Sequence, residues 1–390
     1  MSKEKTILII DATYLEKKPN RERNVIIFST WIQEQFAHLT IVTTQEGMVW
    51  YRELFALEFL PYITFVRLPW SSDFVSTGGL SIVREYMKRI VGAYFFLSRC
   101  LGKSYTAVYS LTAILPDVCI SYILASRLSE MKWSVVFDNF VKKPSEREGR
   151  YWLNAIPYLS HLVSLHLLRS ADSIFSAMVE KNLLRLRDTF RSSSVEIVPD
   201  TNGVDIECLQ RVVGTVGAYD IICVGRLHVD KGIFDLLEII RLVARQRPAL
   251  QVMLVGWGSP DTEAEVRAFI AKHHLDGQIV WKKHVSKEEK YCLLKSAKIF
   301  CFLSHFESYP VAVLEAMACG LPIYAYPLDI FSFPPFTLGM IHTFLNADFE
   351  EAAEIITHAL EHWQPTAVTE SLLSLLDQRS SARRQYAHFL

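Results

Sequence analysis

Short apolar runs that alternate with longer stretches of helical periodicity restrict the fold of this chain more than any other feature. The first half has such runs at 6–10, 39–43, 63–67, 105–109, 133–137, 173–177 and 194–198. The second half has them at 220–225, 251–255, 279–281, 299–303 and 322–325. Helical patterns lie between several of these runs, which predicts parallel strands covered by helices on both faces of each sheet. The predicted fold class is therefore α/β, with two doubly wound, Rossmann-like halves.

A turn-rich segment, Pro199-Asp-Thr-Asn-Gly203, separates the two series of runs. The chain has 390 residues, which is enough for two domains with a core each. We predict an N-terminal domain over 1–204 and a C-terminal domain over 205–370. Residues 371–390 are predicted to form a C-terminal helix, for which packing back on the N-terminal domain is one arrangement.

The charge balance and the cysteine pattern argue against several classes of protein. The formal net charge is −1, so no global field attracts nucleic acid. The seven cysteines are scattered without a CxxC pair, which favours reduced thiols over a disulfide or zinc framework. The apolar runs are broken before 18 residues, and the charged start Met1–Lys5 leads straight into a strand. We therefore expect neither a transmembrane helix nor a signal peptide, and a cytoplasmic location.

The stretch from Ser304 to Pro322 carries the strongest indications of a ligand site. A short helix is predicted over 310–319, with Pro310 at its first position and Gly320 just past its end. Glu307 would lie in the loop before this helix, and Glu315 in its second turn. Both carboxylates could then face a ligand at the helix N-terminus, an end that favours an anion.

Two further strand ends in the second half carry glycines or cations. Run 220–225 is followed by Arg226 and then by Lys231-Gly232, and run 251–255 is followed by Gly256-Trp-Gly258. The carboxyl ends of parallel strands lie at one edge of a sheet, so these residues should converge with the helix N-terminus. An arginine fork and a lysine ammonium at that point would form a diphosphate clamp.

Each of these residues alone has an ordinary interpretation. Arg226 and Lys231 could be solvated surface charges, and either glutamate could be a helix-surface residue. Gly256-Trp-Gly258 lacks the third glycine of a dinucleotide-binding motif, which argues against a nicotinamide dehydrogenase. The inference depends on their joint occurrence in a fixed order on successive strand ends.

In these residues the sequence resembles the retaining glycosyltransferases of the GT-B fold, specifically glycosyltransferase family 4. The resemblance covers about residues 198–327. It is carried by Asn202-Gly-Val-Asp205, Val224-Gly-Arg226-Leu-His-Val-Asp-Lys231-Gly232, Leu254-Val-Gly256-Trp-Gly258 and the pair Glu307-x7-Glu315. It implies two domains that face each other across a cleft, with the N-terminal domain on the acceptor side and the C-terminal domain binding the sugar nucleotide. It also implies transfer of a hexosyl-type sugar from a nucleoside diphosphate sugar to an acceptor, with retention of anomeric configuration, in carbohydrate biosynthesis.

The same resemblance implies roles for individual residues. Arg226 and Lys231 would hold the diphosphate, Glu315 the ribose hydroxyls, and the segment around His284 and Val285 the nucleobase. The implied catalytic residues are Glu307, which would contact the transferred sugar, and Asp138. The implied donor-binding residues are Arg226, Lys231, Gly232, Gly256, His284, Val285, Tyr309, Val311 and Glu315. The family usually needs no metal and no cofactor beyond the sugar-nucleotide co-substrate, and the lack of a D-x-D at a strand end agrees with this.

The first half departs from the family pattern at two places. The charged segment from Tyr14 to Arg23 replaces a Gly-Gly loop, and Phe137-Asp138-Asn139-Phe140 keeps the aspartate of a His-Asp pair without the histidine. Two other functions therefore stay open: a non-catalytic sugar-nucleotide-binding protein of the same fold, and a sugar-nucleotide epimerase. The acceptor could be a sugar, a lipid-linked molecule or another small molecule.

Residues 82–103 combine an apolar stripe of helical period with basic residues. The basic residues are Arg84, Lys88, Arg89, Arg99 and Lys103. We expect a domain helix that packs on its sheet and exposes these charges to solvent. The alternative is a basic surface for anionic lipid headgroups, which would make the protein peripheral to a membrane.

Overall fold

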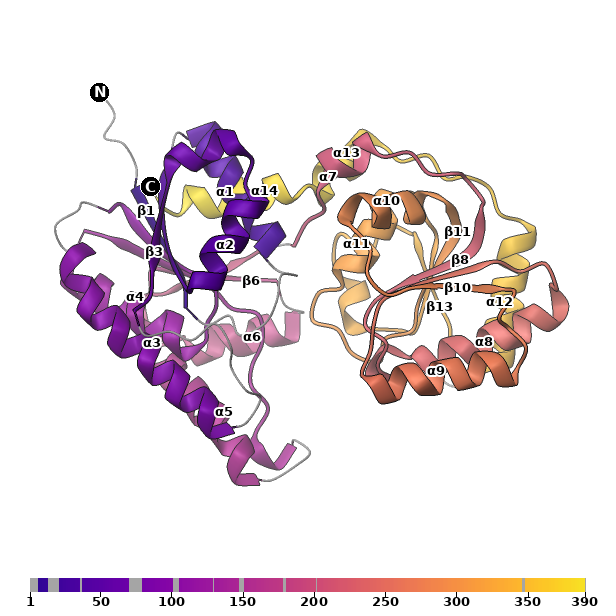
Figure 1. Cartoon of the computed structure of the whole chain (residues 1–390), viewed down its shortest axis with the longest axis horizontal. Coiled ribbons are helices and arrows are strands. Elements are labelled where there is room, and N and C mark those ends of the chain that lie inside the picture. The colour runs from indigo at the N-terminus through magenta and orange to yellow at the C-terminus, as the bar shows by residue number, and fades with distance from the viewer. Residues whose placement is uncertain are drawn as a thin grey trace. The chain divides into compact units, whose positions relative to one another are not determined.

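The computed structural model describes residues 6–12, 21–35, 37–69, 79–100, 105–128, 130–146, 151–177, 180–200, 202–345 and 348–389 (Figure 1). The chain divides into two compact units. The first contains residues 1–201 and 378–390, and the second contains residues 202–377. The domain ranges predicted from the sequence end at 204 and 370. Most of the charged segment expected from Tyr14 to Arg23 lies outside the described residues.

The first unit contains a parallel sheet of seven strands in the order β3-β2-β1-β4-β5-β6-β7. In chain order the strands are β1 (Thr6–Asp11), β2 (His38–Thr43), β3 (Ile63–Arg67), β4 (Ala107–Ser110), β5 (Lys132–Val136), β6 (Ser173–Ser176) and β7 (Glu196–Pro199). The strand order reverses between β1 and β4, where a doubly wound sheet opens a crevice at its carboxyl edge. The strands in the middle of the sheet are buried on both faces, which explains their continuous apolar runs.

Helices cover both faces of this first sheet. They are α1 (Arg21–Gln35), α2 (Gln45–Leu54), α3 (Gly79–Cys100), α4 (Leu115–Arg127), α5 (Tyr151–Leu167), α6 (Glu180–Thr189) and α14 (Gln378–Ala387). Helices α3, α4 and α5 contact one another on one face, and α14 packs against α1 on the other. Each face has its own core, one around Val118 and Trp133 and the other around Phe28 and Trp31.

Helix α14 closes the first unit from the end of the chain. The Trp31 ring nitrogen donates to the carbonyl of Ala382 at 2.7 Å. The carboxylate of Asp200 accepts hydrogen bonds from Ser381 and Gln385. These contacts are buried, so the last helix is an integral part of the first unit.

The second unit contains a parallel sheet of six strands in the order β10-β9-β8-β11-β12-β13. In chain order they are β8 (Tyr219–Val224), β9 (Val252–Val255), β10 (Ile279–Lys282), β11 (Ala297–Phe302), β12 (Ile323–Ala325) and β13 (Ile341–Thr343). The order reverses between β8 and β11. The strands that precede Arg226 and Ser304 are therefore neighbours at the switch point, which is where such sheets bind ligands.

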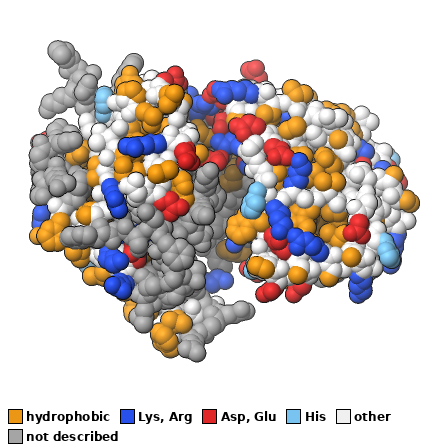
Figure 2. Space-filling model, in the orientation of Figure 1, with side chains coloured by type: hydrophobic (Ala, Val, Ile, Leu, Met, Phe, Trp, Pro, Cys, Tyr) orange, Lys and Arg blue, Asp and Glu red, His pale blue; other side chains and the backbone are white. Residues whose placement is uncertain are grey.

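Seven helices of the described residues belong to this second unit (Figure 1). They are α7 (Ile206–Arg211), α8 (Ile233–Gln246), α9 (Pro260–Lys272), α10 (Lys287–Lys295), α11 (Val311–Ala318), α12 (Phe349–Glu361) and α13 (Glu370–Leu376). Helix α8 packs against α9 and α12, and α11 packs against α10 and α13. On the face shown in Figure 2, acidic and basic side chains both occur over this unit.

The predicted α/β class and two doubly wound halves are confirmed, and each predicted strand overlaps an observed one. Strand β13 was not predicted. The helix expected over 310–319 runs from Val311 to Ala318, with Pro310 as the cap before it rather than as its first residue. Gly320 follows with φ +77°, a left-handed conformation that suits glycine.

The prediction for residues 82–103 was wrong in one respect. Helix α3 does pack within the unit, but Arg89 is only 1% exposed. Its guanidinium donates to the carbonyl of Ala12 at 2.6 Å and pairs with Glu85 at 3.2 Å. Glu85, one turn earlier on the same helix, compensates the charge of Arg89 and allows it to be buried. Among the described residues, no helix is long and apolar enough to cross a membrane.

Candidate functional site

Glycines bring the ends of β8 and β9 into direct contact. Gly256 has φ +145°, and a Cβ atom there would lie 1.7 Å from the carbonyl oxygen of Gly225. A Cβ on Gly258 would lie 2.6 Å from the carbonyl oxygen of Leu227. The amide of Leu227 donates to the carbonyl of Trp257 at 2.9 Å. The Gly256-Trp-Gly258 motif therefore serves close backbone approach between two strand ends, which side chains would prevent.

The loop after β11 is joined to the loop after β8 in the same way. The amide of His305 donates to the carbonyl of Asp230 at 2.9 Å. Gly232 has φ +65°, and a Cβ on it would lie 2.1 Å from the carbonyl oxygen of Leu303. Gly232 is also the cap of α8. These contacts hold the lysine-bearing turn against the strand that leads into α11.

An ion pair joins the loop after β8 to the loop after β11. The Lys231 ammonium lies 2.5 Å from Oε1 of Glu307, and both side chains are mostly buried. Arg226 follows β8 on the same edge and is exposed, and no described residue forms a hydrogen bond or ion pair with it. A lysine ammonium has three N–H donors, so Lys231 can keep Glu307 and still donate to a phosphate.

Glu315 lies in α11 and is only 7% exposed. Its Oε1 accepts from the Lys290 ammonium at 2.6 Å and from the Tyr291 hydroxyl at 3.5 Å. Its Oε2 has no hydrogen-bond partner among the described residues. The ion pair with Lys290 compensates the buried charge, while the second oxygen can still accept a hydroxyl hydrogen.

His284 and Val285 follow β10, on the other side of the Gly256-Trp-Gly258 turn. His284 is exposed, and its ring centroid lies 6.3 Å from that of Trp257, which is 50% exposed. Lys283 pairs with Glu263, and the ion pair lowers the pKa of Glu263. The exposed indole beside His284 adds a flat apolar surface on which an aromatic base could stack.

Tyr309 and Val311 lie at the beginning of α11. The ring of Tyr309 contacts that of Phe336 at 5.4 Å between centroids. Val311 is the first residue of the helix, whose first amides have no partner within the helix. Because Glu307 lies four residues before this helix, its ion pair also keeps Lys231 near the helix N-terminus.

We name Arg226, Lys231, Glu307 and Glu315 together the strand-end site. Within the described residues, no three His, Cys, Asp or Glu side chains cluster so that they could hold a metal ion. Burial raises the pKa of Cys223 in β8 and of Cys319 after α11 to about 12. These two thiols therefore stay protonated at neutral pH and offer no nucleophile.

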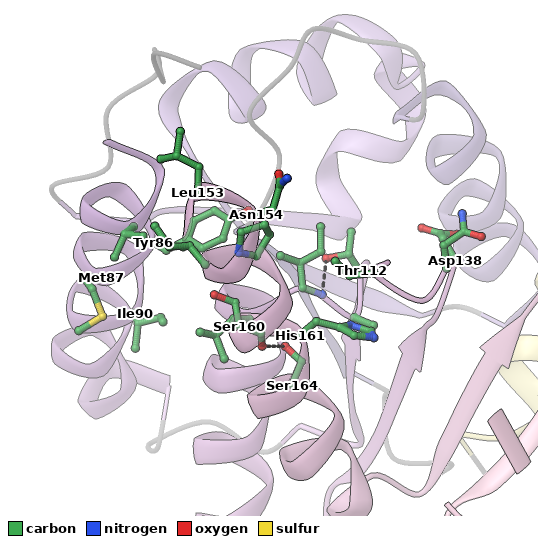
Figure 3. A pocket seen from close by; sticks show the side chains of 18 residues that line it. Tyr86, Met87, Ile90, Thr112, Asp138, Leu153, Asn154, Ser160, His161 and Ser164 are labelled. Atoms are coloured by element: carbon green, nitrogen blue, oxygen red, sulfur yellow. Dashed lines mark hydrogen bonds between the residues drawn. The ribbon is translucent and has the colours of Figure 1, made fainter. Parts of the chain in front are cut away.

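Asp138, the remaining predicted catalytic residue, belongs to the first unit. It follows β5 and lines a cavity there together with Asn139 (Figure 3). Desolvation raises the pKa of the Asp138 carboxyl, although the residue keeps contact with solvent. The residue directly before Asp138 is Phe137 rather than a histidine, yet His161 of α5 contacts the rings of Phe137 and Phe140 on either side of Asp138.

Sequence reasoning missed three residues of these two regions. Lys290 comes from α10, and nothing in its spacing points to Glu315. Trp257 was visible as an aromatic residue between two glycines, but its role beside His284 depends on the next strand. His161 approaches the end of β5 from a helix that begins thirteen residues after Asp138.

The two doubly wound units and the solved structures that they resemble belong to the GT-B fold class. Sucrose-phosphate synthase from Thermosynechococcus elongatus superposes with a TM-score of 0.73 at 15% identity, over 98% of both chains. HepE from Anabaena, solved in complex with UDP and glucose, superposes with a TM-score of 0.63 at 15% identity, over 98% of this chain and 99% of that one. At these identities the likeness establishes the fold alone.

Sequence comparison assigns part of the second unit more closely. Residues 211–331 match the model of the family described as glycosyl transferases group 1. A curated relative from Xanthomonas oryzae, a GDP-mannose:cellobiosyl-diphosphopolyprenol alpha-mannosyltransferase, is 23% identical over 173 residues. That match covers 44% of this chain and 42% of the relative, so it spans less than half the length of either protein. The segment 211–331 that matches the family model contains Arg226, Lys231, Glu307 and Glu315.

Proposed function

We propose that this protein is a glycosyltransferase that moves a hexosyl-type sugar from a nucleoside diphosphate sugar to an acceptor, with retention of configuration and without a metal ion. The observation that carries the proposal is the strand-end site. An exposed arginine, a lysine and a helix N-terminus lie at the switch point of the second sheet, beside two carboxylates. The names of the relatives agree, since one uses GDP-mannose and another was solved with UDP and glucose.

Breaking a sugar–phosphate bond places negative charge on the departing diphosphate. Arg226 can bind two phosphate oxygens and Lys231 can donate to a third, and the first amides of α11 would add further donors. Such fixed donors stabilise the charge that develops in the transition state and need no reorganisation when it forms. They would take over the part that a divalent ion plays in metal-dependent transferases.

The two carboxylates would act on different parts of the donor. Oε2 of Glu315 is free for a ribose hydroxyl, while Glu307, beside Lys231, would lie nearer the transferred sugar. A carboxylate at that place stabilises positive charge that develops on the anomeric carbon. No covalent attack by the protein is needed, since the leaving phosphate can accept the proton of an acceptor that attacks from the same face.

A panel of nucleoside diphosphate sugars in a thermal-shift assay tests the donor class. A ligand that binds only the folded state raises the apparent stability, so the true donor should raise Tm above the value with its free sugar. Proton NMR of the product then tests retention, and a chelator tests metal independence. Inversion, or loss of turnover in EDTA that manganese restores, contradicts those parts of the proposal.

The same assays separate the two alternative functions. A non-catalytic binding protein would give a thermal shift without turnover, whereas a transferase should hydrolyse its donor slowly in the absence of an acceptor. An epimerase would convert the sugar nucleotide into a stereoisomer without any acceptor. Analysis of donor incubated alone with the protein therefore decides among the three.

Peripheral contact with a membrane through α3 is a separate part of the proposal. Lys103 and the side chain of Arg99 lie outside what the structure describes, and few cations among the described side chains are available for this contact. Arg89 is buried, and Lys88 pairs with Glu85 at 3.6 Å. Arg84 is exposed, as are the apolar side chains of Tyr94 and Phe95. Co-sedimentation with anionic vesicles at low salt tests this contact, and a protein that stays in the supernatant contradicts it.

A further inference from the structure

The first unit contains a cavity of about 600 Å³ between α3, α5 and the carboxyl ends of β4 and β5. We call it the α3–α5 cavity. The side chains that line it are Val83, Tyr86, Met87, Ile90, Thr112, Ala113, Ile114, Leu115, Asp138, Asn139, Val141, Leu153, Asn154, Ile156, Pro157, Ser160, His161 and Ser164. Of these eighteen residues only Asp138 carries a formal charge at neutral pH when His161 is neutral. A cavity of this size and character suits a small, largely apolar molecule.

His161 is the exceptional residue of this wall (Figure 3). It is 7% exposed, and its Nε2 atom has no hydrogen-bond partner among the described residues. The rings of Phe137 and Phe140 contact it, with centroids about 6.0 and 5.9 Å away. A buried polar atom without a partner costs free energy, so its persistence calls for a partner that binds in the cavity.

The charge state of His161 narrows the chemistry of that partner. Burial, together with the smaller effect of the nearby guanidinium of Arg185, lowers the pKa of His161 to about 4. The imidazole is therefore neutral near pH 7, and one ring nitrogen donates while the other accepts. A neutral imidazole suits a hydroxyl group better than a carboxylate or a phosphate.

Two hydroxyl groups of the wall, those of Thr112 and Ser164, are already engaged in hydrogen bonds. The Thr112 hydroxyl donates to Asp117 at 2.8 Å and accepts from the amide of Ile114. The Ser164 hydroxyl donates to the carbonyl of Ser160 at 3.1 Å. Among the described residues of the wall, Nε2 of His161 is the side-chain polar atom that is both buried and without a hydrogen-bond partner.

We propose that the α3–α5 cavity binds the apolar body of an uncharged alcohol, and that His161 positions its hydroxyl through a hydrogen bond to Nε2. The alcohol is the acceptor of the glycosyl transfer. This last identification rests on the proposed function, whereas binding of an alcohol in the cavity does not.

Two simple probes test the binding step: 4-phenyl-1-butanol and butylbenzene, which share an apolar body and differ in the hydroxyl. The full-length protein should bind the alcohol about fivefold more tightly than the hydrocarbon, the effect of one net hydrogen bond. His161→Phe keeps a flat ring but removes both nitrogens, so the two probes should then bind equally. The matched control is His166→Phe on the exposed side of the same helix, which should keep the fivefold preference.

Nitrogen NMR of the histidine side chains gives a second measurement on the unmodified protein, in case His161→Phe does not fold. The alcohol should shift the Nε2 signal of His161 and leave that of His166 in place, while butylbenzene should leave both in place. A fold-preserving Ala113→Phe change, which fills the cavity, should weaken both probes at least tenfold. Equal affinity for the two probes, or an Nε2 signal that responds to neither, means that the cavity holds only water and overturns the proposal.

Failure of the cavity proposal can be distinguished from failure of the proposed glycosyltransferase function. Binding of a nucleoside diphosphate is measured independently by calorimetry. Loss of the alcohol preference with intact nucleotide binding removes the cavity proposal alone. An intact alcohol preference in a protein that ignores every sugar nucleotide removes the transferase and leaves the cavity as a binding site. If both hold, the alcohol that binds best should also be glycosylated, and its hydrocarbon counterpart should compete with it.

Discussion

The strand-end site of the second unit and the α3–α5 cavity of the first unit lie at equivalent edges of two similar sheets, yet they are built differently. The first is assembled from glycine-mediated backbone contacts and from ion pairs such as Lys231–Glu307 and Glu315–Lys290. The second is lined mostly by apolar and uncharged polar side chains, with Asp138 as the one formal charge beside a neutral His161. The strand-end site is therefore suited to a charged ligand, and the cavity to an uncharged one.

The largest effect should come from the backbone of the strand-end site. In Gly256→Ala the new Cβ would meet the carbonyl of Gly225 at 1.7 Å, in a conformation with φ +145°. The strands must separate, so we expect a loss of about 4 kcal/mol in the free energy of unfolding. Gly277→Ala is the control, since nothing lies within 4 Å of its Cβ position. Urea unfolding of both variants checks this, and equal stability would mean that the β8–β9 contact is not tight.

The next largest effect is expected from removal of the lysine of the strand-end site. Lys231→Ala should weaken nucleoside diphosphate binding by about 2–5 kcal/mol, because it removes a partly buried cation and leaves Glu307 to repel the phosphates. Arg226→Ala should act in the same direction. Calorimetry with nucleoside diphosphate and with the unphosphorylated nucleoside measures the effect, which should be much smaller for the nucleoside.

The second unit offers a closely matched control for that lysine. Lys298 is 24% exposed, like Lys231, and pairs with Asp220 at 2.7 Å at the opposite end of the same sheet. Lys298→Ala should leave nucleotide binding unchanged. If Lys298→Ala weakens binding as much as Lys231→Ala does, the charge of the unit as a whole is responsible and the clamp is not.

The two glutamates should differ in the kinetic constant that they change. Glu307→Gln should lower kcat about a hundredfold, since its charge acts where positive charge develops. Glu315→Gln should raise the donor KM about tenfold and leave kcat nearly intact, since a ribose contact is equal in ground and transition states. Steady-state kinetics checks both. A larger loss of kcat in Glu315→Gln would exchange the two roles.

The smallest effect is a pH dependence of stability that originates in the cavity. The pKa of His161 in the folded state is about 4, below the ordinary histidine value of 6.5, so the unfolded chain binds more protons between these two pH values. This contribution to stability is present above pH 6.5 and is lost as the pH falls towards 4. His161→Phe should therefore reduce the fall in unfolding free energy between pH 7 and pH 5 by about 1–2 kcal/mol.

Denaturant unfolding at the two pH values, with His166→Phe as the exposed control, measures this difference. A fall of equal size in the unmodified protein and in His161→Phe would show that His161 is not buried in its neutral form. A histidine stabilised as a cation by a carboxylate would have the opposite effect, because its contribution to the free energy of unfolding is lost as the pH rises.

The strand-end site could be predicted from the sequence because its parts are local. Glycines next to strand ends and charged residues at fixed spacing from them are visible in a linear pattern, and the topology of a parallel sheet brings them together. Strand β13 was not predicted because it has three residues, two of them exposed, and follows an irregular loop. Pro310 was placed one position too far into its helix because a proline suits both the cap and the first turn.

The α3–α5 cavity could not be predicted, because its walls come from segments that are far apart in the chain. The apolar stripe of residues 83, 86, 87 and 90 was visible, but its partner could as well have been the sheet or a membrane. Arg89 looked solvated because burial of an arginine depends on Glu85 and on the carbonyl of Ala12, and the second of these is 77 residues away. His161 gave no signal beyond a histidine on an apolar helix.

The return of the chain to the first unit has a consequence for the order of synthesis. A ribosome makes the seven strands of the first sheet, then the whole of residues 202–377, and only then α14. Until α14 emerges, Trp31 has no carbonyl to donate to, and Asp200 lacks Ser381 and Gln385. The nascent first unit therefore keeps one apolar face uncovered while residues 202–377 are synthesised. A chaperone would be needed during that period.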